Sequence, residues 1–126
     1  MSPQDRTLFL ALRDQAIATL KNIGDDLDYG LIHADPVREN IMLDGDRLQL
    51  IDFDFDFDFD DGGFGFRLFD IATALLKNLT EPDYPDLRVA LTEGYTSRRP
   101  IDLRVLDLFI ALRSATYVGW IMTRMD

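Results

Sequence analysis

The feature that most constrains the fold is an Asp-Gly turn set between two short apolar runs. Residues 44–46 read Asp-Gly-Asp, and they lie between the apolar segments 41–43 and 48–51. An Asp-Gly pair in this position favours a tight turn that joins two antiparallel strands. The sequence therefore predicts a β-hairpin over residues 41–51.

Helical spacing of apolar residues dominates the rest of the chain. Ser2 is suited to be the N-cap of a first helix that begins at Pro3 and ends near Gly24. Further helical faces are predicted over 68–79 and 85–95, and Pro100 separates the second of these from a last, buried helix within the apolar segment 101–125.

Two connecting segments are not helical in pattern. The short apolar run 29–32 leads into a polar stretch, 33–40, whose Pro36 and charges predict a loop, and glycines at 62, 63 and 65 predict a turn before the second helix. We therefore expect a mostly helical α+β fold, organised as one domain over residues 1–126, with a hairpin inserted among the helices.

Composition narrows the function and the compartment. Asp and Glu number 23 against 13 Lys and Arg, so a formal net charge of -10 disfavours binding to nucleic acid or to an anionic membrane surface. The chain has no cysteine, which excludes disulfides and thiolate metal sites. The first six residues show neither the basic nor the apolar region of a signal peptide, so we expect a cytoplasmic protein.

An Asp-Phe dipeptide is repeated four times from Asp52 to Phe59, and Asp60 and Asp61 follow. In a strand, alternation of this kind would place the phenylalanines on one face and the aspartates on the other. Six carboxylates in so short a segment suggest a divalent cation, although the positions of a calcium-binding EF-hand loop are not matched. The phenylalanine face would instead favour packing on a core or on a second copy of the chain, so a homo-oligomer through residues 52–60 is predicted.

The residues with recognisable chemistry surround the hairpin. Asp35 and Asn40 lie in the polar loop that precedes it, and Asp52 directly follows its second strand. Alone, Asp35 and Asn40 would be ordinary turn residues. Together with Asp52 they supply what phosphoryl transfer to a hydroxyl requires: a carboxylate at the acceptor oxygen, here Asp35, and oxygen ligands for Mg²⁺, here Asn40 and Asp52.

These motifs resemble the kinase-like phosphotransferases of the aminoglycoside, choline and homoserine kinase type. In that family a His-Gly-Asp-x-x-x-x-Asn loop precedes an Ile-Asp-Phe or Ile-Asp-Trp strand, a glycine-bearing turn and an Asp-Ile-Ala or Asp-Leu-Ala helix. This chain has the corresponding segments in the same order over about residues 30–79, with Ala34 in place of the loop glycine. The motif His-Ala-Asp at residues 33–35 resembles the homoserine kinase branch of this family.

The resemblance implies a kinase-like C-terminal lobe, with ATP and Mg²⁺ as co-substrate and cofactor and a small-molecule hydroxyl as acceptor. It also implies that His33 and Asp70 support the catalytic loop rather than react. The family spacing of twelve positions to Asp70 is met by Asp58, whereas Asp52 lies eighteen positions away. Asp52 is the first choice for the metal because it follows the strand directly, and Asp58 is the second.

Two departures from the family pattern limit the expected activity. No glycine-rich phosphate loop and no strand lysine precede the loop at 33–40. We therefore expect these residues to lack the N-terminal lobe that binds the nucleotide in this family, and the isolated chain to be inactive. Pro36 also stands where the family usually has a large apolar residue. The alternative function is a non-catalytic module that self-associates through the Asp-Phe repeat.

Overall fold

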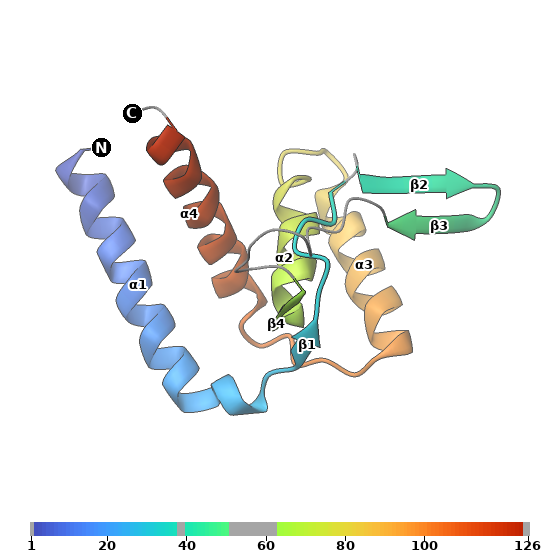
Figure 1. Ribbon diagram of the computed structural model, residues 1–126, viewed down its shortest axis with the longest axis horizontal. Helices are drawn as coiled ribbons and strands as arrows, with labels where there is room; N and C mark the ends of the chain where they lie inside the picture. The colour runs from blue at the N-terminus through green and yellow to red at the C-terminus, as the bar shows by residue number, and fades with distance from the viewer. Residues whose placement is uncertain (1, 38–39, 51–62, 125–126) are drawn as a thin grey trace.

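The computed structural model describes residues 2–37, 40–50 and 63–124. The fold is α+β and mostly helical, as the sequence predicts (Figure 1). In chain order its elements are helix α1 (Pro3–Ile23), the 3₁₀ turn η1 (Gly24–Asp26), strands β1 (Tyr29–Leu31), β2 (Ile41–Asp44), β3 (Arg47–Leu50) and β4 (Phe64–Phe66), and helices α2 (Arg67–Leu76), α3 (Tyr84–Arg98) and α4 (Leu106–Arg124).

Helix α1 begins as its sequence predicts. The Ser2 hydroxyl accepts a hydrogen bond from the backbone N–H of Asp5 at 3.0 Å, and Pro3 occupies the first turn, where a missing N–H costs nothing. The helix runs beside α4 (Figure 1), but of its apolar residues only Ala16 is buried, and Leu8 is 68% exposed. Helix α1 therefore packs on the rest of the fold through only a narrow stripe of its surface.

The hairpin formed by β2 and β3 confirms the prediction from the Asp-Gly turn. Ile41 pairs with Leu50 and Leu43 with Leu48 in an antiparallel register, and Gly45 has a φ of 60°, the left-handed conformation that glycine adopts without steric cost. In Figure 1 the hairpin extends away from the helices.

A second two-stranded sheet was not predicted. β1 pairs with β4 in antiparallel register, with Tyr29 opposite Phe66 and Leu31 opposite Phe64. The predicted glycine-rich turn was therefore wrong at Gly65, because Phe64 and Gly65 belong to strand β4; Gly62 lies outside the described residues. Local sequence could not reveal this pairing, since each strand has three residues and its partner is more than thirty residues away.

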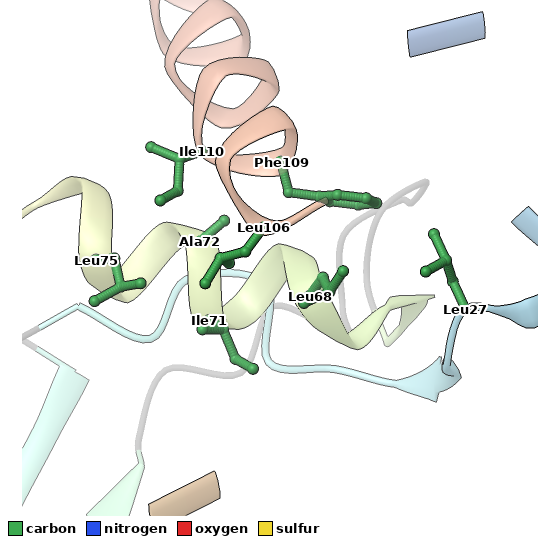
Figure 2. Packing of buried hydrophobic residues seen from close by; sticks show 8 residues of the cluster. All are labelled: Leu27, Leu68, Ile71, Ala72, Leu75, Leu106, Phe109 and Ile110. Atoms are coloured by element: carbon green, nitrogen blue, oxygen red, sulfur yellow. The ribbon is translucent and has the colours of Figure 1, made fainter. Parts of the chain in front are cut away.

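The hydrophobic core lies where α2 crosses α4, and Leu27 closes it at one end (Figure 2). Leu68, Ile71, Ala72 and Leu75 line one side of α2, at the helical spacing predicted from the sequence. Leu106, Phe109 and Ile110 face them from the first turns of α4. Full burial of each large aliphatic or aromatic side chain contributes about 1.5–3 kcal/mol, so this contact fixes α4 against the rest of the fold.

Helix α4 is shorter than predicted, because it begins at Leu106 and not near Ile101. The Asp102 carboxylate accepts the backbone N–H of Arg104 at 2.9 Å and so holds a turn before the helix. Apolar residues of this turn pack on the core without being helical, namely Ile101, Leu103 and Val105. Periodicity alone cannot separate such a segment from a helix. None of the helices in the described part of the chain is long and apolar enough to cross a membrane.

An ion-pair cluster around Asp28 ties three elements together just before β1. Its carboxylate accepts hydrogen bonds from Arg67, the first residue of α2, at 2.7 Å and from Arg99, directly after α3, at 2.5 Å. Gly30 leaves room for this arrangement, since a Cβ there would collide with the Arg67 guanidinium. The cluster thus anchors the strand that leads into the loop at 33–40.

Candidate functional site

The carboxylate of one residue of α2 binds the backbone of the loop that follows β1. Asp70, in the first turn of α2, accepts the backbone N–H of His33 at 2.7 Å through Oδ2 and that of Ala34 at 2.8 Å through Oδ1. The backbone N–H of Asp35 in turn donates to Nδ1 of the buried His33 at 3.1 Å. Three consecutive backbone N–H groups are therefore satisfied by side chains.

Ala34 takes a conformation that alanine adopts at a cost. Its φ is 80°, and no other non-glycine residue in the described segments has a positive φ. The methyl group clashes with the backbone in this region, which costs about 1–2 kcal/mol. The loop retains the conformation because the N–H of Ala34 is bound by Asp70 and its carbonyl accepts Nη2 of Arg113 at 3.2 Å.

Asp35 and Asn40 lie side by side, as the spacing of the loop predicts. The Asn40 amide nitrogen donates to the Asp35 carbonyl at 2.8 Å and to Asp35 Oδ2 at 3.3 Å. Between them, Pro36 is spanned by a hydrogen bond from the Val37 N–H to the Asp35 carbonyl at 2.8 Å, and Val37 is buried. Proline suits this turn because it needs no donor there and its φ is already restricted.

Two residues of α4 that the sequence did not predict as site residues also contact Asp35. Tyr117 donates its hydroxyl to Asp35 Oδ1 at 3.3 Å, and Arg113 Nη2 lies 3.7 Å from the same oxygen. The available signal was weak: Arg113 interrupts an apolar helix, and Tyr117 follows four positions later on the same face.

The predicted metal ligands can be placed only in part. Asp52 and Asp58, and with them the repeat at 52–60, lie outside the described residues. Among the residues that are described, no three histidine or carboxylate side chains gather into a group suited to a metal ion. Asn40 fits a ligand role: its amide nitrogen is committed to Asp35, which leaves the amide oxygen, the kind of atom that Mg²⁺ binds.

Burial and charge shape the titration of the groups around the loop. Burial raises the pKa of Asp70 above its ordinary value, although the two backbone N–H donors act in the opposite direction. Burial also raises the pKa of Tyr117; the Arg113 cation lowers it, and the Asp35 carboxylate raises it. Asp35 itself is 38% exposed and so is accessible to a ligand.

This geometry can serve proton transfer next to a cation site. The Asp35 carboxylate is partly exposed, and each of its oxygens accepts a hydrogen bond. With the Asn40 amide beside it, this arrangement would suit a general base next to a metal ligand.

Comparison with known proteins decides the family. The model of the phosphotransferase enzyme family matches residues 3–109, most of the chain. The chain belongs to this phosphotransferase family. The resemblance drawn from the loop, the hairpin and the Asp70 helix is thereby confirmed.

Curated relatives of this phosphotransferase chain include homoserine kinases. Those of Brucella abortus strain S19 and of Brucella ovis are each 34% identical over 109 residues, and that of Brucella anthropi is 33% identical over 109 residues. Each match covers 83% of this chain but only 32% of the relative, so the chain spans about a third of the length of these enzymes. No solved structure matches the chain significantly.

Proposed function

We propose that this chain forms the part of an ATP-dependent phosphotransferase that activates a small-molecule hydroxyl. Asp35 is the general base that accepts the proton of the acceptor hydroxyl, and Asn40 is a Mg²⁺ ligand. His33 and Asp70 hold the loop in shape. The observation that carries the proposal is the pairing of Asp35 with Asn40 in a loop whose backbone is bound by Asp70.

The arrangement suits the division of labour in phosphoryl transfer. The reaction depends on positioning and on neutralising phosphate charge, so a base must be rigidly placed beside the metal that binds the phosphates. The Asp35 carboxylate is bound at Oδ2 by Asn40 and at Oδ1 by Tyr117. Asp52, with Asp58 as the second choice, supplies the carboxylate ligand that the described residues lack.

Homoserine is the acceptor we propose. The curated relatives carry the name homoserine kinase, and homoserine has the free hydroxyl group that Asp35 would deprotonate. ATP and Mg²⁺ are the co-substrate and the cofactor proposed for the complete enzyme. When bound, Mg²⁺ would neutralise charge on the phosphate oxygens.

A chimera tests the proposal. The part of the Brucella abortus homoserine kinase that matches, 32% of that enzyme, would be replaced by the matching 83% of this chain, and homoserine-dependent consumption of ATP would be measured. We expect activity that is lost by a factor of about a thousand or more in Asp35→Asn, because the general base and its orientation contribute rate factors of that order.

The matched control is Asp14→Asn, which removes a carboxylate from the exposed surface of α1 and should leave the rate unchanged. Circular dichroism would verify that each chimera is folded. A folded chimera that consumes ATP no faster with homoserine than without it, or that keeps its rate in Asp35→Asn, contradicts the proposal.

A further inference from the structure

Arg113 lies at the centre of a contact between α4 and the loop at 33–35. Its side chain is 15% exposed. Nη2 donates to the Ala34 carbonyl at 3.2 Å and to the Tyr117 hydroxyl at 3.1 Å, and Nη1 donates to Thr116 Oγ1 at 3.2 Å. The guanidinium therefore links the loop backbone to two side chains of its own helix.

Aromatic rings enclose this guanidinium. Its central carbon lies 4.6 Å from the centre of the Phe69 ring and 4.2 Å from that of Tyr117, distances at which a cation is attracted to the π-face. Arg113 Nε is buried without a hydrogen-bond partner among the described residues. Burying a cation in this way costs desolvation energy, which the two rings, the hydrogen bonds and a nearby anion offset together. The carboxylate of Asp35, with Oδ1 3.7 Å from Nη2, is the anion that forms an ion pair with Arg113, and the Asp70 carboxylate also interacts with the Arg113 charge.

Tyr117 extends the contact to the carboxylate itself. Its hydroxyl donates to Asp35 Oδ1 and accepts from Arg113, so the phenol is an intermediate in a chain of hydrogen bonds from cation to carboxylate. Because Asn40 binds the other oxygen, Oδ2, the Asp35 carboxylate is fixed from two directions: by its own loop and by α4. Lys77 places a second cation 4.4 Å from the Tyr117 ring centre.

We propose that Arg113 and Tyr117 are positioning residues for Asp35, holding its carboxylate in the orientation in which it meets the acceptor hydroxyl. This inference rests on the proposed function, because it takes Asp35 to be the general base. Misplacement of a reacting group by about 1 Å can reduce a rate by about a hundredfold, so a base on a loop needs such support. Helix α4 provides it because the core contact with α2 holds the helix in place.

The proposal is tested through the titration of the Tyr117 phenol in this chain, without nucleotide, acceptor or metal. The signal is the ¹³Cζ resonance of labelled tyrosine, followed by NMR as the pH is raised and assigned among the four tyrosines with Tyr117→Phe. In Asp35→Asn the pKa of Tyr117 is expected to fall, because the carboxylate that disfavours the phenolate is gone. In Arg113→Met it is expected to rise, because the cation that favours the phenolate is gone.

Shifts of opposite sign show that the phenol is coupled to one anion and one cation, which a side chain that only fills space would not produce. If Arg113→Met does not fold, Arg113→Gln removes the same charge while keeping a polar side chain. Asp14→Asn on the exposed face of α1 is the matched control and should leave the titration of Tyr117 unchanged.

A second signal reports on the carboxylate directly. In Tyr117→Phe the ¹³Cγ resonance of Asp35 at neutral pH should move, because one of its hydrogen bonds is lost. A Tyr117 titration that is the same in Asp35→Asn as in the parent chain would overturn the proposal. Since no reaction is measured, that result is distinct from failure of the proposed function, which the homoserine-dependent assay of the chimera decides.

Discussion

Asp70 Oδ1 accepts the backbone N–H of Ala34 at 2.8 Å, across 36 residues of sequence. Ala34 has a positive φ, and the bond from Asp70 is one of two that keep it there. The candidate base follows immediately in the chain. The position of Asp35 therefore depends on Asp70 in α2 and on Arg113 in α4, both of which lie far from the loop in sequence.

Replacing Asp70 should destabilise the fold. Asp70→Ala leaves two backbone N–H groups without their acceptor, and each unsatisfied buried donor costs about 1–3 kcal/mol. Asp70→Asn, which keeps one acceptor oxygen, should lose less. Urea unfolding measures the free energy of unfolding. The matched control is Asp86→Ala, since Asp86 is an exposed residue in the first turn of α3; an equal loss in both alanine variants would show that the loop contacts of Asp70 contribute nothing.

Glycine at position 34 should be tolerated or stabilising. Ala34→Gly removes the steric cost of the positive φ, about 1–2 kcal/mol, and loses part of this gain through the greater freedom of glycine in the unfolded chain. The net expectation is an increase of up to about 1 kcal/mol in the free energy of unfolding. Ala18→Gly, in the exposed middle of α1, should lower it by about 0.5–1 kcal/mol. Thermal unfolding that gives both variants the same sign would contradict this account of Ala34.

The Asp28 cluster should make stability depend on pH in the acid range. Hydrogen bonds and charge from Arg99 and Arg67 lower the pKa of Asp28 below its ordinary value of 3.8. The unfolded chain then binds the proton more readily, so the stabilisation is complete above pH 3.8 and is lost as the pH falls through the lowered pKa.

Asp28→Asn is the variant that checks this. Its free energy of unfolding should lie below that of the parent at pH 6, and the difference should shrink towards pH 2. Urea titrations at several pH values measure the difference, and subtracting the two curves removes the contribution of the other carboxylates. A difference that is constant across the range would mean that the charge of Asp28 is not what stabilises the cluster.

A polypeptide of these 126 residues alone should not turn over ATP at an enzymatic rate. It spans about a third of the homoserine kinases it matches, and positioning of the phosphates requires groups on both sides of the nucleotide. A coupled assay for ADP with homoserine present provides the measurement. Sustained turnover that Asp35→Asn abolishes would refute this expectation.

The Asp-Phe repeat should promote association of the chain with itself. The repeat lies outside the described residues, so the prediction rests on sequence: each phenylalanine left in water forfeits about 1.5–3 kcal/mol relative to burial. Deleting residues 54–59 removes three Asp-Phe units and should shift the species seen by analytical ultracentrifugation towards the monomer. Exchanging Phe55 and Phe57 for serine is the control that keeps the length. Identical sedimentation of all three proteins would remove the repeat from any role in assembly.

The sequence by itself determined the elements whose signals are local. The Asp-Gly turn specified the hairpin, and the Ser2-Pro3 pair specified where α1 begins, because turn and cap preferences act over a few residues. The apolar spacing of α2 likewise identified the face that lies in the core. The proximity of Asp35 and Asn40 was also predictable, since one short loop carries both.

Tertiary structure alone decided the rest. The pairing of β1 with β4 and the approach of Arg113 and Tyr117 to Asp35 join segments more than thirty residues apart. The left-handed backbone of Ala34 likewise depends on hydrogen bonds to the distant residues Asp70 and Arg113. No local preference encodes such contacts: Ala34 disfavours its own conformation, and Arg113 is an unfavourable residue to bury. They exist because the packing of α4 on α2 brings the helix against the loop, and that packing is a property of the whole core.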